Sequence, residues 1–76
     1  MKKVVITISE LYLDRIEWVA ESLREEGLTI THLYEFGVII GYALEENIVQ
    51  MRHQEGILSL SEEKEPNVPP SDEEIQ

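Results

Sequence analysis

The run Val38-Ile39-Ile40-Gly41-Tyr42-Ala43 constrains the fold of this 76-residue chain more than any other stretch. Its residues are β-branched, aromatic or small, which favours a pleated strand over a helical turn. Gly37 marks the turn into this strand, and Glu45-Glu46 marks the start of a helix after it. The run therefore predicts a central strand with a neighbouring strand on each side.

The residues before this run indicate a strand followed by a helix. Val4 to Ile8 is β-branched and apolar on both alternate faces, which predicts an interior strand. Ser9 is expected to cap a helix from Leu11 to Glu26. Apolar residues at spacings of three and four give that helix one buried stripe, made of Tyr12, Ile16, Val19, Ala20 and Leu23. Gly27 is expected to end it in a left-handed cap.

Three further elements follow from the remaining pattern. Leu28 to Phe36 alternates in polarity, which predicts a half-buried strand. In that strand Ile30, His32, Tyr34 and Phe36 share one face, and Thr29, Thr31, Leu33 and Glu35 share the other. A second helix is predicted from Glu45 to Gln54, ended by Gly56. Ile57 to Leu60 is predicted as the fourth strand.

The predicted order is strand, helix, strand, strand, helix, strand. Two right-handed split units of this kind interlock into one four-stranded antiparallel sheet of order 4-1-3-2, with both helices on one face. We expect one α+β domain over residues 1–62, followed by an acidic, proline-containing and flexible tail over residues 63–76. Val38, Ile40 and Tyr42 are the candidates for the uncovered face, where exposed apolar residues usually indicate a partner.

Composition limits the possible partners and compartments. The formal net charge is -10, from 16 acidic against 6 Lys and Arg side chains, which disfavours nucleic acid. No cysteine is present, which fits a reducing compartment. No apolar run approaches the length of a signal sequence or a membrane span, so the expectation is a cytoplasmic protein without a membrane partner.

No group of residues predicts a catalytic centre or a cofactor site. His32 and His53 lack further ligands at a spacing typical of metal sites. Ser9 is better explained as a helix cap than as a nucleophile. The lysines lie near the start of the chain and in the tail, whereas a Schiff-base lysine needs a buried amine. We therefore expect a protein that is not an enzyme and needs no metal or cofactor.

The second half of the chain carries a resemblance to a known family. The residues concerned are Gly41 and Ala43 in the third strand, Ile48 and Met51 in the second helix, and the ending Ile57, Leu60 and Ser61-Glu62-Glu63. In this pattern the chain, over residues 4–63, resembles the propeptides of subtilisin-type serine proteases and the small inhibitors built on the same fold. Leu44 stands where that family usually has a capping Ser, Asn or Asp.

The resemblance implies a ferredoxin-like βαββαβ fold and a protease as partner. In that family the open sheet face lies on two parallel helices of the protease, and acidic residues cap those helices. Glu62 and Glu63 would take that role here. The tail would run through the active site, with Ile75 and Gln76 nearest the catalytic serine. The predicted function is a non-enzymatic protein-interaction module of this inhibitor type.

Two alternatives stay open at this point. A ribbon-helix-helix DNA-binding repressor would also begin with a basic start, a β-run and a helix. Its second helix, from near Thr31, would have to contain Gly37 and Gly41, at about 1 kcal/mol for each glycine relative to alanine. The other alternative is a small structural or regulatory homodimer joined through the open sheet face.

Overall fold

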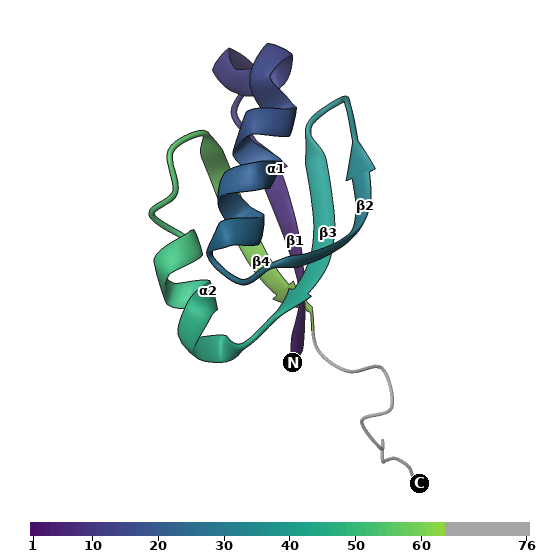
Figure 1. The fold of residues 1–76 in the computed structure, drawn as a ribbon. Helices are drawn as coiled ribbons and strands as arrows, with labels where there is room; N and C mark the ends of the chain where they lie inside the picture. The colour runs from purple at the N-terminus through teal and green to yellow at the C-terminus, as the bar shows by residue number, and fades with distance from the viewer. Residues whose placement is uncertain (64–76) are drawn as a thin grey trace, which may run out of the picture.

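A computed structural model describes residues 1–63 of the chain. Its elements run in the order β1 (Lys2–Ile8), the 3-10 helix η1 (Glu10–Arg15), α1 (Ile16–Glu25), β2 (Thr29–Tyr34), β3 (Val38–Ala43), α2 (Glu45–Met51) and β4 (Ile57–Glu63). Figure 1 shows these elements as a sheet with the helices packed against it. The α+β class expected from the sequence is confirmed.

The four strands form one antiparallel sheet in the order β2-β3-β1-β4. This is the predicted order 4-1-3-2 read from the opposite edge. β1 lies in the interior of the sheet and pairs with β3 on one side and β4 on the other. β3 is also interior, between β1 and β2. The two apolar runs that predicted interior strands are therefore the two strands that lack an edge.

Both helices pack on the same face of the sheet (Figure 1). Alternate residues of the interior strands, such as Ile6 of β1 and Ile39 of β3, are fully buried there. They form one cluster with the buried residues of the helices, which are Ile16, Val19, Ala20 and Leu23 of α1 and Ile48 and Met51 of α2. Burial of these apolar side chains is the main stabilising contribution in a domain this small.

The first predicted helix is divided into two parts. Ser9 lies at its start as expected, and its Oγ accepts a hydrogen bond from the Leu11 amide at 3.3 Å. The residues Glu10–Arg15, however, adopt a 3-10 helix, and the α-helix begins only at Ile16. Tyr12 packs against the edge of the core and stacks on Trp18, with ring centroids 6.2 Å apart.

Glycines stand at the turns, but one of them has a different role from the predicted one. Gly27 (φ 108°) follows α1, and Gly37 (φ 120°) closes the hairpin between β2 and β3, both in a conformation that favours glycine. The prediction that Gly56 ends the second helix is wrong, because α2 ends at Met51. Gly56 (φ 98°) lies in the loop just before β4, where its missing side chain leaves room for the Tyr12 ring.

The ribbon-helix-helix architecture is not the fold of this chain. It requires a helix from near Thr31, whereas residues 29–34 and 38–43 form two paired strands. The two glycines and the β-branched run that disfavour a helix are accommodated in that hairpin. In the part of the chain that the structure describes, no helix is both long and apolar enough to cross a membrane.

Candidate protein-binding face

The side of the sheet opposite the helices carries three rows of side chains, which we call the open face. The strand register defines these rows across β4, β1, β3 and β2. They are Glu63, Lys3, Tyr42 and Thr29; Ser61, Val5, Ile40 and His32; and Ser59, Thr7, Val38 and Tyr34. Within residues 1–63, neither helix contributes a side chain to these rows.

The three residues that the sequence assigns to this face lie there together. Val38, Ile40 and Tyr42 alternate with Ile39, Gly41 and Ala43, which are buried on the helix side. Val38 and Ile40 are half-buried by their neighbours in the sheet, and Tyr42 is 36% exposed. Val5 of β1 lies directly opposite Ile40 and extends the apolar area to a second strand.

A β-bulge in β2 adds aromatic side chains to the open face. Ile30 pairs with Gly41 and His32 with Ile40, so Thr31 is the extra residue, and its Oγ1 donates a hydrogen bond to the Ile40 carbonyl at 3.1 Å. The bulge reverses the alternation of β2. Ile30 therefore packs toward the core, and the prediction that it shares a face with His32 and Tyr34 is wrong.

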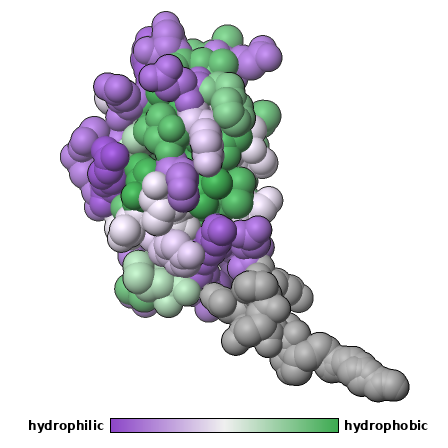
Figure 2. Space-filling view, turned by 90° about the vertical axis from the view of Figure 1, so that its right-hand side faces the viewer, coloured by the Kyte–Doolittle hydropathy of each residue, from purple (hydrophilic) through white to green (hydrophobic). Residues whose placement is uncertain are grey.

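The aromatic residues that follow the bulge form a stack, which we call the aromatic ladder: His32, Tyr34 and Phe36. The ring centroids of His32 and Tyr34 are 5.9 Å apart, and those of Tyr34 and Phe36 are 5.4 Å apart. Tyr34 is 39% and Phe36 73% exposed, which is unusual for side chains of this size. Seen from the β2 edge, hydrophilic residues gather along one side of the molecule and hydrophobic ones over the middle of the view (Figure 2).

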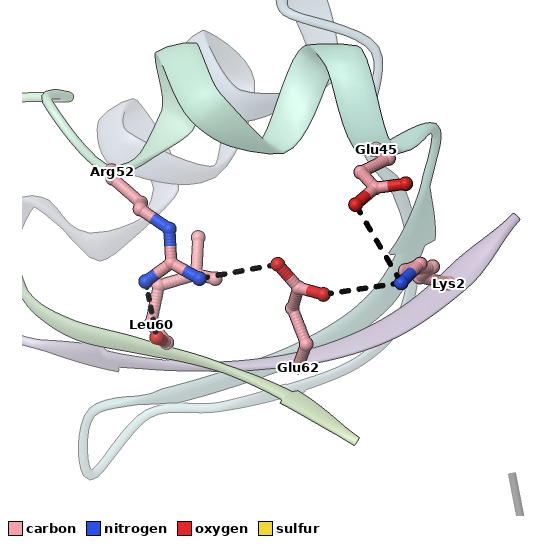
Figure 3. A network of polar contacts seen from close by, with 5 residues as sticks. All are labelled: Lys2, Glu45, Arg52, Leu60 and Glu62. Carbon is pink, nitrogen blue, oxygen red and sulfur yellow. Dashed lines mark hydrogen bonds and ion pairs between the residues drawn. The ribbon is translucent and has the colours of Figure 1, made fainter. Parts of the chain in front are cut away.

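The two adjacent acids Glu62 and Glu63 point to opposite sides of the sheet. Glu62 lies on the helix side, where it accepts a hydrogen bond from Arg52 Nη2 at 3.2 Å and pairs with Lys2 Nζ at 3.5 Å (Figure 3). Arg52 Nη1 also donates to the Leu60 carbonyl at 3.0 Å, and Lys2 approaches Glu45 at 3.8 Å (Figure 3). This network joins the end of β4 to α2 and β1.

Glu63 is the one of the two acids that lies on the open face. It stands opposite Lys3 in the register, and the two side chains form an ion pair at 3.2 Å. The sequence analysis gives Glu62 and Glu63 the same role, that of capping helices of a partner. The structure brings only Glu63 together with Val38, Ile40 and Tyr42 on the open face. Ile75 and Gln76 lie outside the described residues.

Both edges of the sheet are interrupted by bulges. Besides Thr31 in β2, the register of β4 shifts between its pairs with Thr7 and Ile8, which leaves Leu58 as an extra residue. Leu58 is 70% exposed. Bulges at edge strands disfavour the addition of a further strand. The face of the sheet is therefore better suited to docking than its edges.

The other surface features of residues 1–63 give weaker indications of a site. An open cleft of about 570 Å³ lies beside Trp18, lined by Leu13, Asp14, Arg15, Ile16, Glu17, Trp18 and Glu35. Its lining mixes charges of both signs, with Arg15 beside the carboxylates of Asp14, Glu17 and Glu35. In this part of the chain no three His, Asp or Glu side chains gather in a way that could hold a metal ion.

Comparisons with known proteins find no matching family model, no similar curated protein and no similar solved structure.

Proposed function

We propose that the chain is a non-enzymatic protein-interaction module of ferredoxin-like topology, which docks a protein partner on its open face. The observation that carries this proposal is the apolar and aromatic surface on the uncovered side of the sheet. A domain of this size has few apolar residues for its core, and each one left on the surface forgoes about 1.5–3 kcal/mol of burial. Placing Ile40, Tyr42 and Tyr34 together outside the core is consistent with burial against another protein.

The resemblance to subtilisin propeptides suggests the first partner to test. In that family the open face docks on protease helices, and an acidic side chain caps a helix start. A carboxylate at a helix N-terminus gains about 0.3–1 kcal/mol from the helix dipole. Glu63 is the candidate for this role, because it lies on the open face in the same row as Tyr42 and its ion pair with Lys3 is exposed. Glu62 lies on the helix side, where Arg52 and Lys2 engage it.

Titration against a subtilisin-type protease tests this proposal, with binding and inhibition measured separately. We expect the full chain to bind and to inhibit, and Tyr42→Glu to weaken binding at least tenfold by placing a charge in the contact. Glu63→Gln should weaken binding less, and its effect should shrink as salt is raised. Val49→Glu is the matched control, because Val49 is an exposed apolar residue on α2, away from the open face.

The same titration tests the two C-terminal residues. If Ile75 and Gln76 reach the catalytic serine, Ile75→Asp in the full chain should reduce inhibition while leaving binding through the open face unchanged. A wild-type chain that neither binds nor inhibits the protease would overturn the propeptide-type assignment.

A further inference from the structure

We infer that the open face docks on a second copy of the same chain, in a two-fold symmetric dimer. This inference rests on the proposed function, because it names the occupant of the same face. It is carried by the distribution of charge over the two sides of the sheet and by the way in which apolar and polar residues divide the open face.

The open face carries no net formal charge on a chain whose net charge is -10. Its three rows, as defined within residues 1–63, contain one basic side chain, Lys3, and one acidic side chain, Glu63. These two side chains form an ion pair with each other. A partner that recognised this protein by its acidity would gain nothing at this surface. An identical, equally acidic chain is compatible with it, because the docked surfaces themselves are neutral.

The acidic side chains of the helices lie on the other side of the sheet. Glu17 and Glu21 belong to α1, and Glu45 and Glu46 to the first turn of α2. Two sheets pack about 10 Å apart, and a helix layer adds about 10 Å on each side, so these acids would be about 30 Å apart in the dimer. That separation exceeds the Debye length of about 8–10 Å at physiological salt. Docking through the sheet therefore keeps the acidic side chains of the two sets of helices apart, whereas docking through the helices would bring them together.

The division of the open face into two halves indicates where the two-fold axis lies. The half over β2 and β3 is apolar and aromatic, with Ile40 at its centre, and the half over β4 carries Ser59 and Ser61. An axis near Ile40 places the apolar half against its own copy and leaves the serines at the rim. Interfaces generally have this arrangement, with an apolar core and a polar rim.

The size of the face sets the expected strength of the dimer. Four strands about 4.8 Å apart and rows about 7 Å apart along them give a projected area of roughly 300–400 Å². This is small beside the roughly 800 Å² per partner of a standard interface. We therefore expect reversible association with a dissociation constant of about 10 μM to 1 mM.

Sedimentation of the full chain over about 5 μM to 1 mM tests the inference in the range where such small interfaces associate. We expect the wild type to shift from monomer to dimer. Tyr42→Glu and Tyr34→Lys should each raise the dissociation constant at least tenfold, and Val49→Glu should leave it unchanged. Thermal unfolding of each variant shows whether it is folded, and Tyr34, on the edge strand, is the safer of the two sites.

A second measurement needs no variant. Amide chemical shifts of the wild type should change with concentration along β2, β3 and β1 on the open face and stay constant on α1. A wild type that remains monomeric at about 1 mM, or a dimer that Val49→Glu disrupts and Tyr42→Glu does not, would overturn the inference. The protease titration is read at concentrations below self-association, so the two proposals can fail independently.

Discussion

Tyr12 provides a titration that reports on the contact between η1 and the loop before β4. Its hydroxyl donates a hydrogen bond to Glu55 Oε2. This hydrogen bond, together with desolvation and the negative charge of Glu55, raises the pKa of Tyr12 above its usual value of 10.0. The positive charge of Arg15 lowers the pKa by a smaller amount. Because the pKa is raised in the folded state, the bond stabilises the fold fully below about pH 10. That contribution is lost as the pH rises through the raised pKa.

We expect Glu55→Gln to bring the pKa of Tyr12 down toward 10.0, because the variant removes both the charged acceptor and its electrostatic effect. Ultraviolet titration of tyrosinate absorbance measures this shift. Tyr12→Phe identifies the transition that belongs to this residue, since its step disappears from the curve. Identical titration curves for wild type and Glu55→Gln would contradict the contact.

At the scale of elements, Gly41 and the bulge at Thr31 determine how β2 joins the sheet. A Cβ on Gly41 would meet the Thr29 carbonyl oxygen, and would lie 3.1 Å from Ile30 Cα. Both atoms belong to the backbone of β2, so relief requires the strand to move. We expect Gly41→Ala to destabilise the fold by about 1–3 kcal/mol, the usual range for overpacking.

Urea unfolding measures this loss, and hydrogen exchange of the β2 amides should show local opening of the edge strand before global unfolding. Ser61→Ala is a suitable control, because Ser61 is exposed on the other edge of the open face. Equal stabilities for Gly41→Ala and the wild type would show that β2 can shift at little cost.

The same strands show which parts of the structure can be predicted from the sequence. Interior strands are apolar on both faces, and helices have a stripe at spacings of three and four, so the element order follows from periodicity. Strand alternation also groups Val38, Ile40 and Tyr42 on one face, but it does not show which face the helices cover. The bulge does not, because one extra residue reverses a two-residue alternation without changing composition. The adjacent polar residues Thr31 and His32, which lie beside Ile40, are the one local signal of it.

The opposite directions of Glu62 and Glu63 were predictable and were missed. Neighbouring residues in a strand point to opposite faces, so two adjacent acids cannot both lie on the docking face of an extended β4. The expectation placed the end of β4 at Leu60, whereas the strand continues to Glu63. The length of the strand depends on its pairing with β1 and on the Arg52 network, which are tertiary contacts that the local pattern does not contain.

At the scale of the whole molecule, the net charge and the ion pairs act on folding in opposite directions. The ion pairs found in residues 1–63 join exposed side chains, and such pairs contribute about 0–1 kcal/mol each. Repulsion within a chain of net charge -10 acts against the compact state throughout. Salt screens both effects, so a rise or a fall of the melting temperature with added salt shows which effect is larger.

We expect the melting temperature to rise from low salt to about 0.5 M NaCl, because the dispersed repulsion is larger than the exposed pairs. A gain of about 1 kcal/mol would correspond to about 4–8 °C for a domain of this size. The melting temperature should be measured at a few micromolar protein, below the range of self-association, because dimer formation would itself raise it.

The double variant Glu17→Gln/Glu25→Gln provides the control. It removes two acids from α1 that take part in none of the ion pairs above, so it should melt higher than the wild type at low salt and respond less to added salt. A melting temperature that falls as salt is added would mean that the ion pairs, above all the network around Glu62, contribute more than the repulsion that salt relieves.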